Sequence, residues 1–261
     1  MRRMSGYIGV GDNSKKVSKM YVGVSGQSKA VQKAYIGVNG KAKLWYELGI
    51  PAGELSIGAT IKGIYGNEDF IVVHKGNPNT SIYDSSCDGV WLMAKNCVTS
   101  LRFNSVRRRD ITNSEAMNWL NSTFYNALAI KDFVKTVKIP YYGTGNSPSL
   151  YIGANGYSTK VFLLSAVEAG FTGRYTSAFV GDGGKLAYFD YTDDSNYKRA
   201  VTLNGNGVEW WMRTPRRDIS YYQEDQAVKP NTSGGYGRGW VNESHGIRPV
   251  FIVPYDTKLK I

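Results

Sequence analysis

The stretches that decide the fold are Glu209-Trp210-Trp211-Met212-Arg213-Thr214-Pro215 and Gly246-Ile247-Arg248-Pro249-Val250-Phe251-Ile252-Val253. Both are rich in the β-branched and aromatic residues that suit a pleated, half-buried surface. Because proline cannot donate to a strand ladder, we predict that these two strands end at Pro215 and at Pro254.

About thirty polar residues separate the two predicted strands. Residues 216–222 and 231–240 show neither helical nor strand periodicity, and they are rich in Tyr, Arg, Asn and Gly. Such side chains dominate adaptable binding surfaces, and a long loop inside a compact domain is usually functional or disordered. We predict a displayed binding loop; a solvated loop without function is the alternative.

The composition of this 261-residue chain is that of a folded globular protein. No apolar run has the length of a membrane span, and the N-terminus leads into polar repeats and not into an apolar signal core. We therefore expect no membrane insertion and no signal peptide. Cys87 and Cys97 can form at most one disulfide, and two buried free thiols are the open alternative.

The positive charge is concentrated at the N-terminus. Residues 1–46 hold nine of the 32 Lys and Arg residues and one of the 21 Asp and Glu residues, so +8 of the formal net charge of +11 lies there. The rest of the chain is nearly balanced. Charge therefore says little about what the C-terminal loop binds.

The same N-terminal segment contains an internal repeat with a spacing of 14 residues. Tyr7-Ile8-Gly9-Val10, Tyr21-Val22-Gly23-Val24 and Tyr35-Ile36-Gly37-Val38 are each followed by a turn and a basic strand-like piece. Each copy predicts a β-hairpin. Since one hairpin is marginal alone, we expect a small meander, at residues 1–48, that stacks on its own copies, on another subunit or on a larger assembly.

A Gly/Pro boundary at residues 49–53 precedes a predicted mixed α and β domain at 49–261. We expect a strand pair at 55–64 and 70–75 with a turn at Gly66-Asn67, and a third strand at 89–94. The capping box Thr112-Asn113-Ser114-Glu115 predicts a helix, and Ser165-Ala166-Val167-Glu168 predicts a second, short one.

Four motifs in this order resemble a known family. They are Asn118-Trp119-Leu120-Asn121 with Phe124, Lys160–Ser165 with Glu168-Ala169, Trp210–Pro215, and Gly246–Val250. Together they resemble an uncharacterised bacterial and phage branch of the C-type-lectin-like fold, which formylglycine-generating enzymes and variable proteins of diversity-generating retroelements share. The N-terminal repeats resemble modules of phage tail proteins. The predicted fold class is thus α+β, a C-type-lectin-like domain preceded by a small all-β hairpin-repeat module.

The resemblance implies a non-enzymatic receptor-binding or adhesion protein, tail-associated or diversified by a retroelement, in the virion or in the host cytoplasm before lysis. Its partners would be a host cell-surface protein or glycan and, through the repeats, virion or tail proteins or further copies of the chain, for example in a trimer. The implied ligand-binding residues are Arg213, Arg216, Arg217, Asp218, Ser220, Tyr221, Tyr222, Asn231, Tyr236, Arg238 and Trp240.

Catalytic chemistry is not indicated. The enzyme branch needs two reactive cysteines in the C-terminal part, and no cysteine follows Cys97. A calcium-dependent sugar site needs several oxygen ligands, but Lys229 stands where one is required, so we expect no cofactor and no metal. The alternatives to receptor binding are an oxidase relative and nucleic-acid binding through the basic repeats.

Overall fold

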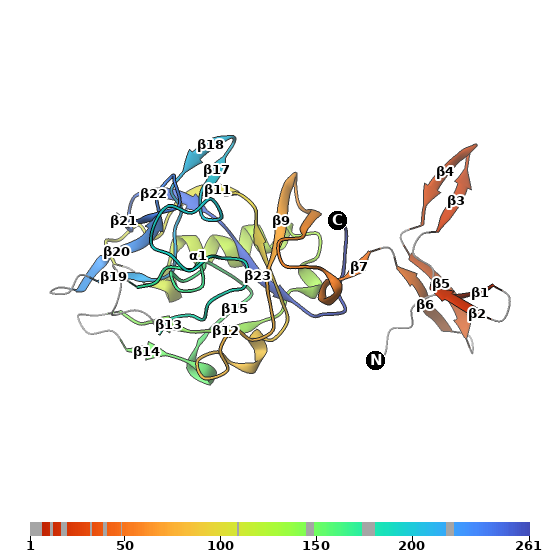
Figure 1. Cartoon of the computed structure of the whole chain (residues 1–261), viewed down its shortest axis with the longest axis horizontal. Helices are drawn as coiled ribbons and strands as arrows, with labels where there is room; N and C mark the ends of the chain where they lie inside the picture. Colours follow the sequence, from red (N-terminus) through yellow and green to blue (C-terminus); the bar gives the residue numbers. More distant parts are fainter. Residues whose placement is uncertain are drawn as a thin grey trace.

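The computed structural model describes residues 7–10, 13–16, 20–31, 33–38, 41–47, 49–108, 110–144, 149–173, 181–217 and 222–261. Figure 1 shows three hairpins at the N-terminus, outside the body that the later residues form. They pair β1 (Tyr7–Val10) with β2 (Asn13–Lys16), β3 (Tyr21–Val24) with β4 (Gln27–Ala30), and β5 (Lys33–Val38) with β6 (Lys41–Glu47).

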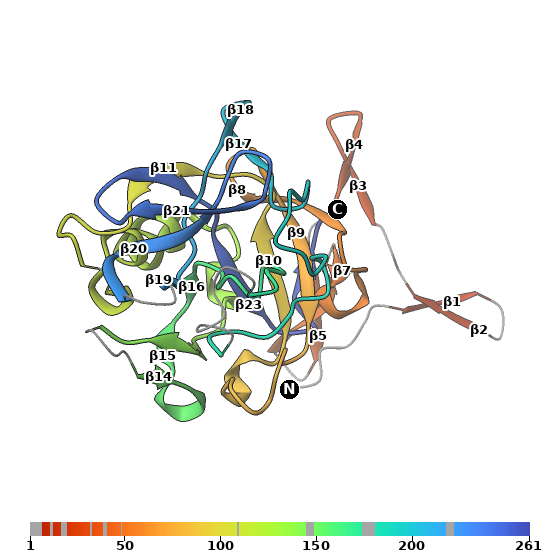
Figure 2. The same ribbon diagram turned by 60° about the vertical axis from the view of Figure 1, so that its left-hand side comes forward.

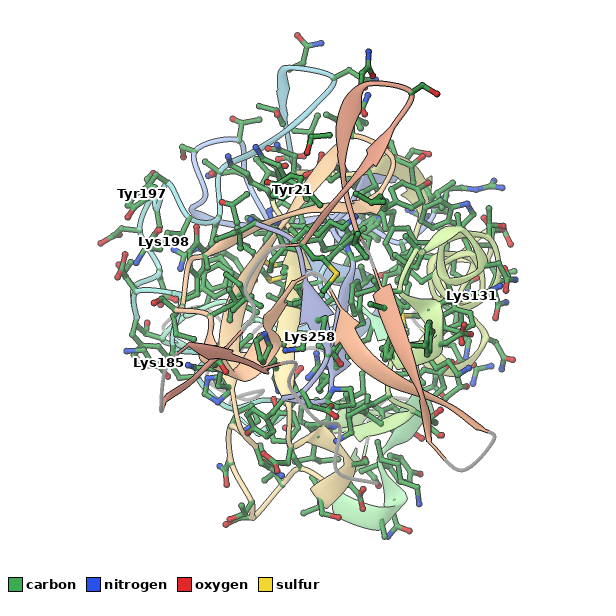
Figure 3. All side chains as sticks on the ribbon, turned by 90° about the vertical axis from the view of Figure 1, so that its right-hand side faces the viewer. Tyr21, Lys131, Lys185, Tyr197, Lys198 and Lys258 are labelled. Atoms are coloured by element: carbon green, nitrogen blue, oxygen red, sulfur yellow. The ribbon has the colours of Figure 1, made fainter. Side chains whose placement is uncertain are left out.

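The 14-residue repeat therefore does form hairpins, as predicted. In the second copy Ser25 and Gly26 both have positive φ, 52° and 77°, the geometry of a two-residue hairpin turn. The three hairpins are separate two-stranded sheets and not one continuous meander. Tyr21 and Tyr35 are each 58% exposed on their strands (Figure 3 labels Tyr21), so the hairpins leave apolar side chains uncovered.

The body of the protein is built on a five-stranded antiparallel sheet. Its strand order is β16 (Val161–Phe162), β23 (Val250–Val253), β10 (Val90–Ala94), β9 (Glu68–Lys75) and β8 (Thr60–Tyr65). Every residue of β10 and β23 is buried, because both faces of the sheet are covered. On one face Phe70 contacts Phe251 and Phe124; on the other Trp91 contacts Phe162 and Tyr83.

One continuous helical segment covers the first of these faces. It consists of α1 (Glu115–Trp119), the π-helical turn η4 (Leu120–Phe124) and α2 (Tyr125–Ala127). Ser114 caps α1 by accepting a hydrogen bond from the Met117 amide at 2.9 Å. The predicted cap Thr112 instead lies in a separate 3-10 turn that Asp110 caps, so the helix starts two residues later than its capping box suggested.

Small sheets surround this core (Figures 1 and 2). They are β11 (Thr99–Arg102) with β22 (Ser244–Ile247), β12 (Val137–Ile139) with β15 (Tyr157–Thr159), β13 (Tyr141–Tyr142) with β14 (Leu150–Tyr151), β17 (Val201–Leu203) with β18 (Asn206–Val208), β7 (Ile50–Pro51) with β24 (Lys258–Leu259), and β19 (Pro215–Arg217) with β20 (Tyr222–Pro230) and β21 (Tyr236–Trp240). The remaining 3-10 turns are η1 (Ala52–Glu54), η2 (Ser85–Cys87), η3 (Ile111–Asn113), η5 (Lys131–Phe133) and η6 (Gly153–Asn155).

The predicted α+β class is wrong. Strands make up 36% of the residues and helices 14%, and the longest helical segment has 13 residues, so the protein is mainly β. The second predicted helix does not form: the Ser165–Glu168 capping hydrogen bonds are present, but residues 166–170 make only turns. The Glu168 carboxylate, which would cap a helix there, also accepts hydrogen bonds from Arg213 and Tyr83.

The two deciding stretches also differ from the prediction. In the first, Trp210 makes an isolated bridge to Gly246, and the strand β19 begins at Pro215 where we expected one to end. The second stretch is divided at Arg248-Pro249 into β22 and β23, and β23 does end before Pro254. The polar segment between them is largely the β20–β21 hairpin and not a loop.

No helix in the described part of the chain combines the length and the apolar content that a membrane span requires.

Candidate ligand-binding face

The β21 strand places three of the predicted binding residues on one side. Side chains alternate along a strand, so Tyr236, Arg238 and Trp240 point to the same side. Arg238 is exposed, and Trp240 is partly exposed. Tyr236 is half-buried and packs edge-on against Phe171 at 6.1 Å, so it joins the core more than the surface.

A second segment, remote in sequence, completes this face. The loop after β11 is fastened to β21 because the Asn104 amide donates to the Val241 carbonyl at 2.9 Å. It carries the exposed side chains Arg107 and Arg108, and the Arg107 guanidinium lies 4.3 Å from the centre of the Trp240 ring. A cation over an indole face at this distance is an attractive contact. We call Arg107, Arg108, Arg238 and Trp240 the Arg–Trp face.

Tyrosines border the Arg–Trp face. Arg108 donates to the Thr144 hydroxyl at 2.9 Å, and Thr144 closely follows β13. There Tyr141 stacks on Tyr151 at 5.0 Å with an interplanar angle of 16°, and Tyr151 is 41% exposed. Burial, the neighbouring Tyr151 and Asp110 raise the pKa of Tyr141, so its hydroxyl stays neutral and able to donate a hydrogen bond.

Arg216 supports this face from beneath. It is 7% exposed, and its Nη1 donates to Gln226 Oε1 at 2.5 Å. Gln226 is the register partner of Trp240 across the β20–β21 ladder. Arg216, which we predicted to contact a ligand, is thus buried against β20, the strand that pairs with the one carrying Trp240.

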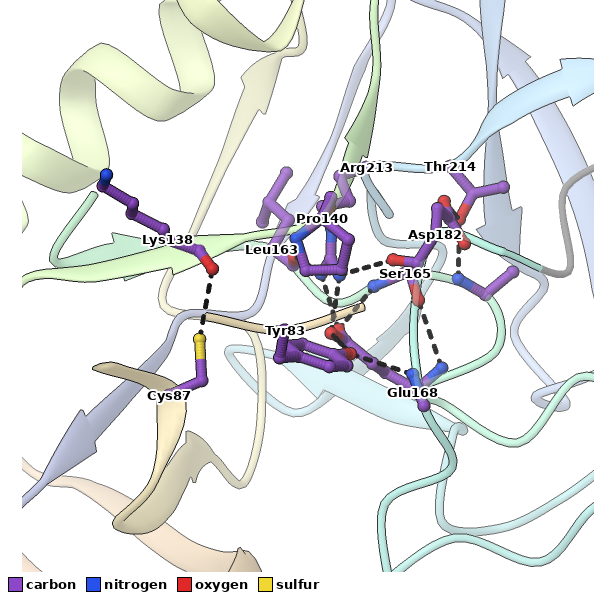
Figure 4. A network of polar contacts seen from close by, with 12 residues as sticks. Tyr83, Cys87, Lys138, Pro140, Leu163, Ser165, Glu168, Asp182, Arg213 and Thr214 are labelled. Atoms are coloured by element: carbon purple, nitrogen blue, oxygen red, sulfur yellow. Dashed lines mark hydrogen bonds and ion pairs between the residues drawn. The ribbon is translucent and has the colours of Figure 1, made fainter. Parts of the chain in front are cut away.

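Arg213 is also buried and lies in a polar network (Figure 4). Its two terminal nitrogens donate to Glu168 Oε1 and Oε2, each at 2.5 Å. The Arg213 guanidinium also donates hydrogen bonds to the carbonyl oxygens of Pro140, Leu163 and Asp182. The Tyr83 hydroxyl donates to Glu168 Oε1 at 2.5 Å and accepts from the Gly184 amide. Arg213, which we also predicted to bind a ligand, is 1% exposed and thus presents no surface in this structure.

The electrostatics of this network favour a permanent ion pair. Burial by itself would lower the pKa of Arg213, but the charge and hydrogen bonds of Glu168 raise it above the usual value. Burial and the Glu168 charge also raise the pKa of Tyr83 well above its usual value. The network thus joins five separate segments of the chain. It is structural support beneath the surface and offers no exposed group to a ligand.

The remaining predicted residues divide into three groups. Asn231 organises the β20–β21 turn, because its side-chain oxygen accepts from the Ser233 and Gly235 amides. Arg217 and Tyr222 lie in strands at the β19–β20 tip, and nothing is described of their side chains. Asp218, Ser220 and Tyr221 lie outside the described residues.

Sequence reasoning missed Arg107, Arg108, Tyr141 and Tyr151. The run Val106-Arg107-Arg108-Arg109 between two polar segments, and the Tyr141-Tyr142 pair, were available as signals of exposed recognition residues. Nothing in the sequence indicated that Arg107 would contact Trp240.

The two cysteines are free and buried, which decides between the open alternatives in favour of thiols. Burial raises the pKa of Cys87 to about 12 and that of Cys97 to about 12. Both thiols are therefore protonated at neutral pH, and a protonated thiol is a poor nucleophile.

Lys229 is the residue that, by the predicted resemblance, stands where a calcium-dependent lectin would need an oxygen ligand. Its ammonium group is nearly buried and forms an ion pair with Glu209, whose carboxylate also lies 3.6 Å from His245 Nδ1. Among the described residues, no three His, Cys, Asp or Glu side chains gather in a group that could hold a metal ion.

Residues 88–255, more than half of the chain, match the model of a family described as "Domain of unknown function (DUF6273)". The chain belongs to this family. The DUF6273 region includes the Arg–Trp face, the Tyr141–Tyr151 stack and the Arg213–Glu168 pair. No curated protein and no solved structure matches, so the resemblance to the C-type-lectin-like fold stays a prediction.

Proposed function

We propose that the protein is a receptor-binding or adhesion protein whose Arg–Trp face contacts a protein or glycan on a host cell surface. The observation that carries this proposal is the Arg107 guanidinium stacked over Trp240, with Arg108 and Arg238 exposed beside it. Trp, Tyr and Arg are the residues that contribute most to binding energy in interfaces.

The backbone beneath the face supports the same proposal. Trp240 lies in a strand, opposite Gln226, which the buried Arg216 holds. Residues held in strands lose little conformational entropy when a partner binds, so more of the contact energy remains as affinity. The predicted binding residues Arg217, Asp218, Ser220, Tyr221 and Tyr222 would take part in the same contact.

The N-terminal hairpins would serve attachment in this proposal. In Figure 1 the strands β19, β20, β13 and β14 lie at the end of the molecule away from these hairpins. Isolated two-stranded hairpins are marginal in water, and Tyr21 and Tyr35 are exposed, so a tail protein or further copies of the chain would cover them. A position in the virion, and diversification of the tip by a neighbouring retroelement, remain proposals.

The test uses fluorescently labelled full-length protein on cells of the bacterial host strain. We expect Arg107→Gln and Arg238→Gln each to weaken cell binding at least about ten-fold, as loss of an interface anchor does. Arg102→Gln is the matched control, because Arg102 is paired with Glu115 at 3.3 Å and is not part of the face.

Equal binding by all three variants and the unchanged protein would refute the proposal. Trp240→Ala adds a further readout: it should abolish cell binding, and thermal unfolding shows whether the fold survives. If Arg107→Gln alone leaves the melting temperature unchanged and still loses binding, the loss is one of recognition and not of folding.

A further inference from the structure

A pocket of about 310 Å³ lies where three segments of the body meet. These are the β8–β9 turn, the connection between β10 and β11, and the β17–β18 hairpin. Its lining includes Tyr65, Asn67, Glu68, Asn96, Thr202 and Asn204. None of these residues belongs to the Arg–Trp face, and the pocket plays no part in the function proposed above.

Hydrogen bonds between the three segments fix the pocket walls. The backbone amide of Asn96 donates a hydrogen bond to Glu68 Oε1 at 2.6 Å. Asn96 Oδ1 in turn accepts from the Thr202 amide at 3.3 Å and from the Thr202 hydroxyl at 3.1 Å, and the Cys97 amide donates to the Thr202 carbonyl at 3.0 Å. The site is therefore preformed, as small-molecule sites usually are.

Polar groups remain available to a ligand after these bonds are made. Within the described residues, Glu68 Oε2 and Asn96 Nδ2 take part in no hydrogen bond. The Asn67 and Asn204 side chains are exposed at the rim. Asn204 has φ 52° in the β17–β18 turn, a left-handed backbone conformation that asparagine tolerates. The turn therefore fixes the backbone position from which the Asn204 side chain extends. The rim and wall together offer both donors and acceptors.

The charge of the lining narrows the class of ligand. The lining contains no Lys, Arg or His, and Glu68 is its one carboxylate, so an anion finds no opposite charge there. Glu68 is half-buried, and burial raises the pKa of its carboxyl group. Hydroxyl groups both donate and accept, and they match a mixed set of amides, a carboxylate and the Thr202 hydroxyl.

We propose that this pocket binds one or two rings of a neutral saccharide. Its volume is at the lower end of the range of about 300–1,000 Å³ that small-molecule sites occupy. Tyr65, whose ring packs against Phe124 at 4.6 Å, supplies an apolar surface for the C–H side of a sugar ring. The hydroxyls of the sugar bond to Glu68, Asn96 and the rim amides.

The test is a titration of the full-length, ¹⁵N-labelled protein with glucose, galactose, mannose and N-acetylglucosamine, each followed by amide chemical shifts. We expect at least one sugar to shift the amides of residues 65–68, 96–98 and 202–205, with saturation in the millimolar range.

Two variants keep the walls intact while changing the ligand contacts. Glu68→Gln retains an oxygen for the Asn96 amide, and Asn204→Gly suits the positive φ of that turn. Each should weaken sugar binding at least about five-fold, which is the effect of losing one hydrogen bond. Tyr197→Ser, at a position 77% exposed outside the pocket, is the control and should bind like the unchanged protein.

Butylammonium chloride and sodium sulfate serve as competing probes. The proposal is overturned if no sugar shifts these amides, or if butylammonium or sulfate shifts them and the sugars do not. Cell binding by the Arg–Trp face is measured with different variants. Absence of sugar binding therefore does not contradict the proposed receptor binding, and absence of cell binding does not contradict the sugar site.

Discussion

Arg213 and Glu168 form a two-pronged ion pair in which both side chains are fully excluded from solvent. The pair joins the segment before β19 to the turn that follows β16. Five backbone or side-chain groups beyond the pair complete its hydrogen bonds, which is what allows two charges to be buried.

Replacing Glu168 by Gln should therefore be severely destabilising. The variant leaves the Arg213 guanidinium buried without a counter-charge, and breaking such a pair costs about 3–5 kcal/mol of unfolding free energy. Urea unfolding of Glu115→Gln gives the comparison: Glu115 pairs with Arg102 at the surface, and such pairs contribute about 0.2–1 kcal/mol. Similar losses in the two variants would contradict the structural role assigned to Arg213.

The arginines show what a single sequence cannot reveal. The sequence places Arg213 and Arg216 in a polar, tyrosine-rich neighbourhood, where exposure was the reasonable expectation. Their partners are Glu168, which lies 45 residues away from Arg213, and Gln226 across a hairpin. Arg248 is similarly buried and donates to the carbonyl oxygens of Ala94, Lys95 and Lys198. Only the fold brings these partners together.

Local patterns predicted the elements that depend on local contacts. The hairpin repeats, the β8–β9 turn and β10 follow from turn residues and strand propensity within a few positions. Segment 210–214 has the same propensity but forms no strand, because consecutive amides bond to different segments: Trp211 to Gly246, Met212 to Val228 and Arg213 to Leu164. Tertiary context overrides propensity there.

The β20–β21 hairpin was missed for a related reason. Its glycines suggested a loop, but Gly239 lies in the strand β21. The residue there is glycine because a Cβ atom would come within 2.9 Å of Lys229 and 3.0 Å of His245. A glycine in a strand often marks such a close approach.

Stability should fall as the pH drops below about 6.5, because burial lowers the pKa of His74 and of His245 below the ordinary value for histidine. A lowered folded-state pKa favours the neutral ring in the folded protein. Its contribution is complete above the unfolded pKa and is lost as the pH falls through the folded one. Protonation of His74 would also remove the acceptor that Nδ1 offers to the Ala187 amide at 3.2 Å.

Urea unfolding at pH 7.5, 6.5, 5.5 and 5.0 measures this dependence. His74→Asn keeps an acceptor and cannot titrate, so we expect its stability to fall less between pH 6.5 and 5.0 than that of the unchanged protein. Parallel curves for the two proteins would show that His74 does not contribute.

Gly170 should tolerate no side chain. It has φ 82°, and a Cβ atom there would lie 2.1 Å from the Asp190 carbonyl oxygen, which is backbone and cannot rotate away. Gly205 has nearly the same φ, 83°, with nothing within 4 Å. Gly205→Ala should cost about 1–2 kcal/mol from the left-handed backbone alone. Gly170→Ala should cost at least about 2 kcal/mol more, since overpacking is added; thermal or urea unfolding of both variants gives the difference, and equal losses would contradict it.

The basic N-terminal repeats permit a decisive test of nucleic-acid binding. Lys15, Lys29 and Lys43 occupy equivalent positions, each the register partner of the apolar residue after the repeat tyrosine. If the repeats bound nucleic acid through phosphates, affinity would fall steeply with salt, and changing all three lysines to Glu would reduce the salt slope for a single strand by about 2. On the attachment proposal we expect weak binding of a labelled single-stranded oligonucleotide at physiological salt, and no change in cell binding by the triple variant. Loss of cell binding together with a reduced salt slope would instead assign recognition to the repeats and remove it from the Arg–Trp face.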